Sequence, residues 1–534
     1  MARSELGSLA RGRGVHLGEL PKVLADRYGR RSAVEDPAPT PGLDHAAMRT
    51  FADVEEATAR LAAAHDRRGR RRDERVLVLL DNRLDIVLHV FALARLGAVP
   101  VPVNHRLTEP EVAAVVDATD ASAAIVDPDL AHLVGDDVDV VTVIELAATL
   151  GEHPHDHREP VPDLDPDALA VLMTTSGTTG VPKAAALTSR GLLASLGRLV
   201  LAPVGRKGGP RGGRDGAVAV LPLTHVMGLS VLLGTLCAGV PLLRRGRFDA
   251  AEVLELIEQR RPNVVVAVPT MFADLERAGA AERDLSSVQL WVSSADVLPA
   301  DRARRFQRYG AAARIGGRGL GSALFVDIYG MVELSGAAAI RVFPPSPIGT
   351  LPAPSFALRL PGMQVRAVGP DGEPVRGGQV GELQFRGSGV LRGYEGRDDV
   401  GPDDQGWFAT GDHGRVWPGG VFQFAGRSRD RLKVGGFSVF PAEVEQELRA
   451  HEHVADVAVV GVEDERLGER PVAMVVPRPG FDIEAFLAWS RDAVAGYRRP
   501  TDVIEIDDLP RGPNGKVDRA AATEQATKHL EERS

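Results

Sequence analysis

The sequence predicts an α/β protein with a large N-terminal domain of wound, mostly parallel sheets plus a small β-rich subdomain, and a small α+β C-terminal domain. The length of 534 residues exceeds the roughly 250 to 300 residues at which a single core stops growing. Strand-like runs alternate with helical patterns over the first 300 residues, as in parallel α/β sheets. The pattern changes at about residue 345 and again after Gly426.

The N-terminal elements follow one another in α/β order. An apolar run predicts a buried strand at Val76–Leu80, and an amphipathic helix with Leu84, Val87, Leu88 and Phe91 on its apolar face follows. A helical pattern also starts near Glu109. Further strands are predicted at Ala98–Val103, Ser122–Asp127, Ala217–Leu221, Val264–Val268 and Leu290–Ser293.

The later elements are shorter. Proline and glycine become frequent after 345, and alternating runs at Val380–Arg386 and Val421–Ala425 predict antiparallel strands. Beyond them we expect helices at Pro441–Ala450 and 482–496 and strands at Ala455–Val462 and Val472–Pro477. The sequence therefore divides into domains of residues 1–426 and 427–534.

Composition excludes several classes of protein. Hydrophobic residues at 44% and charged residues at 25% are ordinary globular values. No apolar stretch reaches the roughly 18 residues of a membrane span, and the N-terminus lacks a signal-peptide core, so we expect a cytoplasmic protein without integral membrane association. The lone Cys237 excludes a disulfide or a thiolate zinc cluster, and the net charge of −10 indicates no nucleic-acid partner. The oligomeric state is not predictable.

The strongest motif is Thr174-Thr175-Ser176-Gly177-Thr178-Thr179-Gly180-Val181-Pro182-Lys183, which follows the apolar run Ala168–Met173. Hydroxyls, glycine amides and one lysine are the groups that a polyphosphate needs. The lysine does not directly follow a glycine, so this is not a Walker loop. Only six of the 63 basic residues are lysines, which favours a specific role for a lysine inside a motif.

Residues Ser176–Lys183 resemble the phosphate-binding loop of the adenylate-forming superfamily, which includes acyl-CoA synthetases, nonribosomal peptide adenylation domains and luciferases. Other segments resembling that superfamily follow in the same order over roughly residues 50–518. They are Leu221–Gly228, Asp327–Glu333, Gly381–Gly387, Gly393-Tyr394, Gly406–Asp412, Gly426–Gly436 and Leu509–Val517.

The resemblance implies ATP, Mg²⁺ and a role for each matching residue. The β and γ phosphates would lie on Thr175, Ser176, Gly177, Thr178, Thr179, Gly180 and Lys183, and Mg²⁺ on Thr175 and Glu333. Asp327 would lie near the nucleotide, Tyr329 would stack on adenine, and Asp412 with Arg427 would bind the ribose hydroxyls. Lys516 would be the adenylation lysine, and His225 would lie beside the acid. Rotation of a mobile C-terminal domain at Arg429 would replace Lys516 by the segment that contains Lys433.

The sequence also departs from that pattern. Val332 stands where a threonine is usual, and Ala184 where a glycine is usual. Ser293-Ser294-Ala295-Asp296 is an unusual form of the segment that faces adenine and acid. These differences concern the acid pocket more than the nucleotide site.

Three functions remain open on the sequence alone. The first is a ligase that adenylates a fatty or aryl acid and transfers the acyl group to a thiol, most simply CoA. A carrier-protein thiol or an amine could also accept the acyl group. The second is a diazotase that adenylates nitrite and transfers a nitrosyl group to an aromatic amine. The third is a degenerate nucleotide-binding protein without turnover.

Overall fold

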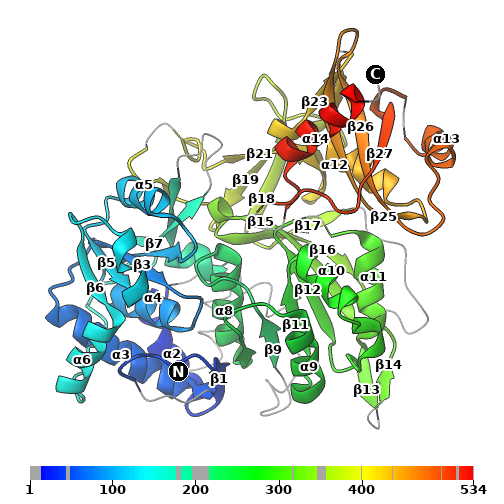
Figure 1. Ribbon diagram of the computed structural model, residues 1–534. Helices are drawn as coiled ribbons and strands as arrows, with labels where there is room; N and C mark the ends of the chain where they lie inside the picture. The colour runs from blue at the N-terminus through cyan, green and yellow to red at the C-terminus, as the bar shows by residue number, and fades with distance from the viewer. Residues whose placement is uncertain are drawn as a thin grey trace.

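The computed structural model describes residues 14–43, 48–175, 182–194, 216–296, 298–315, 318–345, 356–397, 400–435, 437–494, 496–512 and 516–532. A large N-terminal domain contains the helices and sheets of the first 427 residues, and a smaller C-terminal domain lies over one edge of it (Figure 1). This architecture confirms the predicted fold class.

The first sheet is parallel, with strand order β4-β3-β5-β6. Its strands are β3 (Arg75–Leu80), β4 (Val99–Asn104), β5 (Ala123–Val126) and β6 (Asp139–Thr142). The helices of this region are α2 (Leu20–Tyr28), α3 (Phe51–Arg67), α4 (Asp85–Arg95), α5 (Glu109–Thr119) and α6 (Val143–Glu152). Capping boxes begin α3 at Thr50 and α6 at Thr142, because each threonine hydroxyl accepts a bond from the third helical amide.

The largest sheet changes from parallel to antiparallel along its width. Among the described residues its order is β18-β19-β21-β22-β17-β16-β15-β12-β11-β9-β10-β1-β2. The parallel part contains β9 (Ala217–Ala219), β11 (Val264–Ala267), β12 (Leu290–Ser294) and β15 (Leu324–Met331). The parallel part continues through β10 (Leu242–Leu243) and β1 (Ser32–Glu35), and β2 (Met48–Thr50) pairs antiparallel with β1 at the edge.

The antiparallel part begins earlier than the sequence pattern indicated. β16 (Gly336–Phe343) already runs antiparallel to β15, before residue 345. The strands that follow continue the same hydrogen-bonded sheet and do not start a separate one. They are β17 (Ala357–Arg359), β18 (Met363–Val368), β19 (Val380–Gly387), β21 (Phe408–Trp417) and β22 (Val421–Arg427).

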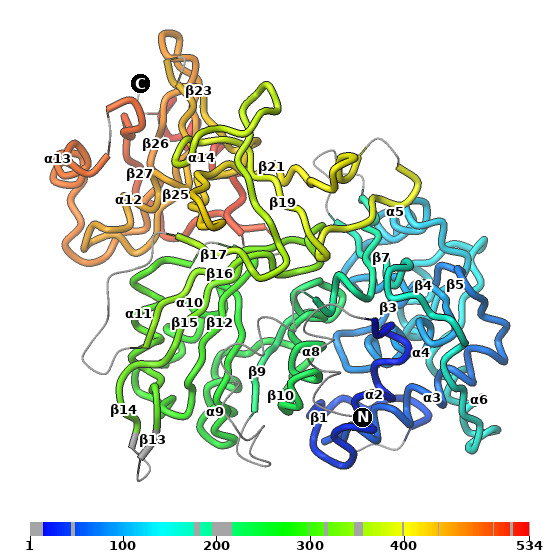
Figure 2. Tube along the Cα trace, turned by 180° about the vertical axis from the view of Figure 1, so that it is seen from behind, coloured from blue at the N-terminus to red at the C-terminus, as the bar shows by residue number. Residues whose placement is uncertain are grey.

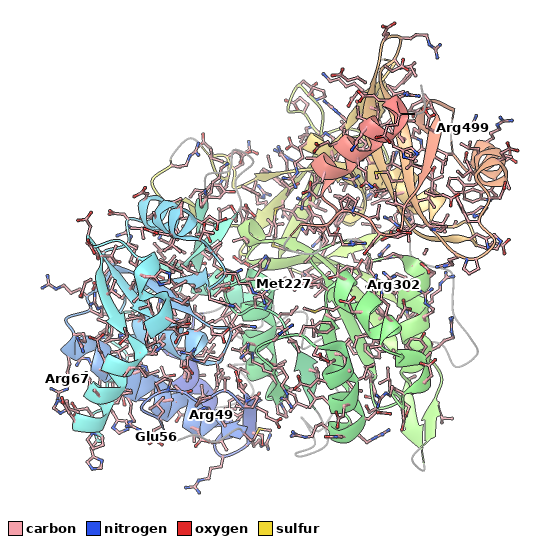
Figure 3. All side chains as sticks on the ribbon, in the orientation of Figure 1. Arg49, Glu56, Arg67, Met227, Arg302 and Arg499 are labelled. Carbon is pink, nitrogen blue, oxygen red and sulfur yellow. The ribbon has the colours of Figure 1, made fainter. Side chains whose placement is uncertain are left out.

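Helices cover both faces of the parallel strands. Helix α8 (Val226–Ala238) is buried along nearly its whole length and lies between the two sheets, as the opposite views show (Figures 1 and 2). Met227, in its first turn, lies in this interior (Figure 3). The other face packs on an aromatic cluster of Phe272, Trp291 and Phe306. Its helices are α9 (Ala250–Arg260), α10 (Pro269–Arg277) and α11 (Ala300–Tyr309), near the hairpin β13 (Ala313–Ile315) and β14 (Arg318–Leu320).

A short sheet places the phosphate-loop motif. β7 (Leu169–Thr175) and β8 (Lys183–Thr188) pair antiparallel, and β20 (Gly393–Tyr394) adds to β8. The apolar run Ala168–Met173 noted in the sequence corresponds to β7, whereas no strand was predicted for the run from Lys183 to Thr188. Residues 189–194 are helical.

The C-terminal domain is an α+β unit with its own apolar packing on each side of its sheet. Its strands are β23 (Leu432–Val434), β24 (Phe437–Val439), β25 (Val454–Asp464), β26 (Gly468–Pro477) and β27 (Asp502–Glu505). Its helices are α12 (Pro441–Leu448), α13 (Ile483–Ala493) and α14 (Arg519–Glu531). In the part of the chain that the structure describes, no helix is both long and apolar enough to cross a membrane.

Candidate active site

The candidate site lies where strands of the large sheet end beneath the C-terminal domain. β12 and β15 are parallel neighbours, so their carboxyl ends meet at one edge, where α/β proteins commonly bind ligands. β15 carries Asp327 and Tyr329 and leads into the turn that contains Glu333. Gly330 has no room for a side chain, because a Cβ atom there would lie 1.8 Å from the carbonyl oxygen of Gly336.

Four predicted residues form what we call the ribose cluster: Tyr329, Asp412, Arg427 and Lys516. The Tyr329 hydroxyl donates to Asp412 Oδ2 at 2.7 Å, and Arg427 Nε lies 3.5 Å from Asp412 Oδ1. Asp412 and Arg427 face each other across β21 and β22. Burial raises the pKa of Asp412, although Arg427, the tyrosine hydroxyl and Lys516 all favour its charged form.

Lys516 is the contribution of the C-terminal domain to this cluster. Burial lowers the pKa of its ammonium group, and the nearby positive charge of Arg427 lowers it further, whereas Asp296 and Asp412 act in the opposite direction. Residues 513–515, directly before it, lie outside the described residues. Lys516 lies 104 positions after Asp412 in the sequence, yet the fold brings the two close enough for their charges to interact.

The Thr410-Gly411-Asp412 motif is held by the neighbouring strand. The Thr410 hydroxyl donates to the carbonyl oxygen of Leu383 at 2.7 Å and accepts the Asp412 amide at 3.1 Å. The Gly411 amide donates to Glu382 at 3.2 Å. These bonds hold the backbone from which the Asp412 side chain projects.

The ring of Tyr329 lies in an aromatic group. It stacks on Phe385 with ring centroids 5.6 Å apart, and the rings of Phe422 and Phe424 lie 5.4 and 6.2 Å away. Burial and the adjacent Asp412 carboxylate raise the pKa of its hydroxyl well above the usual value. Tyr329 therefore stays a neutral donor to Asp412.

The side chain of Tyr394 lies between Lys183 and Glu333 and contacts both. Lys183 pairs with Thr175 across β7 and β8, and its Nζ atom lies 5.4 Å from the centre of the Tyr394 ring. The Tyr394 hydroxyl donates to Glu333 Oε1 at 2.9 Å, and burial together with that carboxylate raises the pKa of the hydroxyl. The other loop residues predicted to bind phosphate, Ser176, Gly177, Thr178, Thr179 and Gly180, lie outside the described residues.

The described residues around Glu333 could bind Mg²⁺ together with phosphate oxygens, but they do not form a metal site made of protein ligands alone. No group of three or more histidine, cysteine or acidic side chains in the described ranges could hold a metal. Mg²⁺ commonly uses one or two carboxylates together with substrate phosphates and water. One carboxylate at Glu333 beside the Thr175-Lys183 strand ends is consistent with that mode.

His225 caps the start of α8, on the side of the site next to Lys516. Its side chain is accessible to solvent, yet the surrounding protein lowers the pKa of its ring and the charge of Lys516 lowers it further. The ring is therefore neutral at pH 7. Lys433 lies apart from these residues on β23, where its side chain is exposed and its amide donates to Glu469 at 2.6 Å.

We call Ser293, Ser294 and Asp327 the strand-end cluster. The Ser294 hydroxyl and Asp327 Oδ1 are buried and have no hydrogen-bond partner in the described structure, whereas the Ser293 hydroxyl lies close enough to the Asp327 carboxylate to favour its charged form. Arg341 donates to Asp327 Oδ2 at 2.7 Å, but burial still raises the pKa of Asp327 to about 6. The next residue after the serines, Ala295, has φ of +76°, a strained value for a residue with a side chain.

The AMP-binding enzyme family matches residues 23–395, and the AMP-binding enzyme C-terminal domain matches residues 443–516.

The chain belongs to the AMP-binding enzyme family.

Relatives of this family member are acyl-CoA ligases. A feruloyl-CoA synthase from Amycolatopsis sp is 34% identical over 88% of this chain and 92% of the relative. An indoleacetate–CoA ligase from Aromatoleum aromaticum is 31% identical over 88% of this chain and 91% of the relative.

Solved structures share the fold. ATP-bound MatB from Rhodopseudomonas palustris has a TM-score of 0.78 and 25% identity, covering 96% of this chain and 99% of that one. An anthranilate CoA ligase in complex with anthranoyl-AMP has a TM-score of 0.81 over 97% of this chain and 98% of that one. At 22% identity, that second likeness shows the fold alone.

Sequence reasoning missed the residues that support the predicted ones. Tyr394 was part of a matching block but had no assigned role, although it joins Lys183 to Glu333. The rarity of tyrosine could have pointed to it, because the chain has only five tyrosines. Two of them, Tyr329 and Tyr394, donate to predicted site carboxylates. Phe385 and Phe422 had no comparable signal, because a buried phenylalanine is ordinary core.

Proposed function

We propose that the protein adenylates an aryl carboxylic acid with ATP and transfers the acyl group to the thiol of CoA. The ribose cluster is the observation that carries this proposal, because it joins Lys516 of one domain to Asp412, Arg427 and Tyr329 of the other. The aryl class is supported by relatives named for ferulate, 4-coumarate and indoleacetate.

Asp412 and Arg427 would bind the ribose hydroxyls of ATP. The Asp412 carboxylate accepts hydrogen bonds, and Arg427 supplies guanidinium donors in a fixed position. Tyr329 orients Asp412 and offers its ring to adenine. The uncommitted Oδ1 atom of Asp327 would accept a bond from the nucleotide, which would satisfy a buried oxygen that otherwise lacks a partner.

The phosphates would lie at the ends of β7 and β8. Lys183 and the hydroxyls and amides of Thr175 to Gly180 would bind the β and γ phosphates. Glu333, oriented by Tyr394, and Thr175 would hold Mg²⁺, which neutralises phosphate charge when bound.

In the first half-reaction a carboxylate oxygen forms a bond to the α-phosphorus, and the bond from that phosphorus to pyrophosphate breaks. The attacking carboxylate is already ionised at neutral pH, so no general base is needed. Positioning and charge neutralisation supply the catalysis, as in phosphoryl transfer. Lys516 would reach both the acid and the α-phosphate. His225, whose lowered pKa keeps its ring neutral, would contact the acid without moving a proton.

In the second half-reaction the CoA sulfur bonds to the acyl carbon, and the bond from that carbon to AMP breaks. We propose that the large domain ends with β22 at Arg427, one residue beyond the boundary predicted between residues 426 and 427, and that the hinge is at Arg429, in the turn Ser428–Asp430 between β22 and β23. Rotation there would withdraw Lys516 and bring the exposed Lys433 segment toward the site. We also propose a cytoplasmic enzyme without nucleic-acid partners.

The test is pyrophosphate release from ATP and Mg²⁺ across short, medium, long and aromatic acids and nitrite, each with CoA or an aminobenzoate. Products are identified by mass spectrometry. We expect an aryl thioester that depends on both ATP and CoA. A product formed only from nitrite and the amine would instead identify a diazotase. ATP binding without pyrophosphate release from any acid would identify a degenerate protein.

A further inference from the structure

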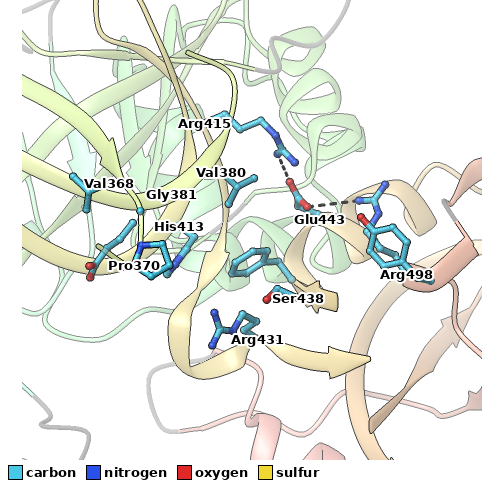
Figure 4. Close-up of a pocket in the computed structure, with 14 residues that line it drawn as sticks. Val368, Pro370, Val380, Gly381, His413, Arg415, Arg431, Ser438, Glu443 and Arg498 are labelled. Atoms are coloured by element: carbon cyan, nitrogen blue, oxygen red, sulfur yellow. Dashed lines mark hydrogen bonds and ion pairs between the residues drawn. The ribbon is translucent and has the colours of Figure 1, made fainter. Parts of the chain in front are cut away.

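An ion pair joins the two domains beside the ribose cluster. Arg415 lies on β21, three residues after Asp412, and Glu443 lies in the first turn of α12. Their side chains form a short ion pair across the boundary between domains, and Figure 4 shows Glu443 between Arg415 and Arg498. Glu443 Oε2 lies 3.6 Å from Arg498 Nη1, so this carboxylate contacts an arginine of each domain.

An aromatic contact fixes where the Arg415–Glu443 pair lies relative to the proposed hinge at Arg429. The ring of Phe440, just before α12, lies 5.2 Å from the ring of His413, and a Cβ atom on Gly426 would meet the Phe440 ring at 2.9 Å. His413 Nδ1 and the Ser428 hydroxyl are 3.0 Å apart. Phe440 therefore packs against the last strands of the large domain, and Glu443 lies one helical turn beyond it.

The space around the pair is open. A cavity of about 580 Å³ separates β18, β19 and β21 from β24, α12 and the segment at Tyr497. Arg415, Glu443 and Arg498 all line it (Figure 4). Val368, Val380 and Phe440 also line this cavity but do not fill it, so the Arg415–Glu443 pair spans an open part of the boundary. An ion pair of this kind can part without exposing a large apolar surface, since its groups are readily solvated.

We propose that Glu443 is a positioning residue for adenylation: its ion pair with Arg415 holds the C-terminal domain in the orientation that places Lys516 at the ribose cluster. This inference rests on the proposed function, because it assumes that the domain turns between two half-reactions. Glu443 does not touch the reacting atoms and acts only through Lys516. Loss of the pair makes other orientations more populated and leaves the chemistry of each half-reaction unchanged.

The test compares the two half-reactions in Glu443→Gln. Adenylation is measured as pyrophosphate release, and transfer is measured as thioester formation from supplied acyl-adenylate and CoA. A partly buried ion pair stabilises one domain orientation only modestly. We therefore expect the ratio of adenylation to transfer rates to fall about three- to tenfold. The transfer rate is expected to stay the same or to rise.

Glu447→Gln is the matched control. Glu447 Oε1 lies 3.0 Å from Arg498 Nη2 and contacts the same arginine, but the pair lies wholly within the C-terminal domain. This variant is expected to keep the wild-type ratio. Arg415→Met tests the other partner and leaves the C-terminal domain unaltered, so it remains informative if Glu443→Gln folds poorly.

Domain orientation gives an independent readout. Cys237 is buried and burial raises the pKa of its thiol to about 12, so cysteines introduced at exposed positions on each domain can be labelled selectively. Energy transfer between two dyes should show a wider distribution of distances in Glu443→Gln than in wild type. An unchanged distribution and an unchanged ratio would overturn the proposal, as would an equal fall in both half-reactions. If the wild type adenylates no acid, the proposed function fails, whereas the distance distribution still tests the ion pair.

Discussion

The ribose cluster and the strand-end cluster lie at the same edge of the large sheet but differ in how their polar groups are satisfied. In the ribose cluster Asp412 has a tyrosine donor and an arginine beside it before any ligand binds. In the strand-end cluster the Ser294 hydroxyl and Asp327 Oδ1 are buried without a partner in the described structure. Buried polar groups without partners are costly, and functional sites are where such costs are commonly found.

We propose from this difference that the ribose cluster acts in catalysis and that the strand-end cluster acts in the choice of ligand. The side chains of the ribose cluster already contact one another, so the cluster is preorganised. A substitution in it should therefore lower the adenylation rate with every acid. Unsatisfied hydroxyls contribute only when a ligand reaches them, so a change there should alter the preference between ligands. The following predictions test this contrast, beginning with the largest expected effect.

Removal of the Lys516 ammonium should have the largest effect. Lys516→Ala is expected to lower pyrophosphate release about 100- to 1000-fold with every acid, because one positioned charge at the α-phosphate is lost. Thioester formation from supplied acyl-adenylate should continue. Lys528→Ala is the control, because Lys528 is exposed on α14. Equal loss of both half-reactions in Lys516→Ala would contradict the assignment.

Asp412→Asn should have the next largest effect. The asparagine keeps the size of the side chain but loses its charge and one acceptor oxygen, so the bond from Tyr329 and the attraction to Arg427 weaken together. We expect KM for ATP to rise about 10- to 100-fold, as for a charge-assisted hydrogen bond worth about 1.5 to 3 kcal/mol. KM for the acid should change much less. Steady-state kinetics with each substrate varied in turn would show an unchanged KM for ATP if the carboxylate does not bind the nucleotide.

Asp327 should make stability depend on pH. Burial raises its pKa to about 6 in the folded protein, against an ordinary value of about 4. The folded state therefore keeps a proton that the unfolded chain releases between about pH 4 and 6, and this contribution to stability is lost as pH rises through 6. Two pKa units correspond to about 2 to 3 kcal/mol.

The test is the free energy of unfolding of wild type and Asp327→Asn, measured by denaturant at pH 4.5, 5.5, 6.5 and 7.5. The variant lacks this titration, so its stability relative to wild type should rise by about 2 kcal/mol over that range. A constant difference at the four pH values would show that the Asp327 pKa is ordinary.

The smallest effect is expected at Ser294. If its free hydroxyl meets a polar substituent of the acid, Ser294→Ala should change the ratio of kcat/KM for hydroxylated and unsubstituted aryl acids about two- to tenfold, the worth of a neutral hydrogen bond. Ser287→Ala is the control, because Ser287 also has a buried hydroxyl without a partner but lies before the other end of β12. An equal change for both acids would place Ser294 outside the acid site.

The sequence by itself determined the fold class, the family motifs and the residue types of the nucleotide site. Alternation of apolar runs with helical patterns is a local property, and it correctly predicted strands such as β3, β5 and β12. The motifs around Lys183 and Asp412 are also local. They can be recognised in the sequence because their glycines, lysine and aspartate follow one another at short, fixed spacings.

Only the tertiary structure decided which of those residues meet. Asp412 touches Tyr329 across 83 positions of sequence, and Tyr394 touches Glu333 across 61. No periodicity encodes such contacts, because they depend on the order of strands in a sheet and on the placement of one domain over another. For the same reason the contact of Glu443 with Arg415 and the unpartnered oxygens of the strand-end cluster became visible only in the folded chain.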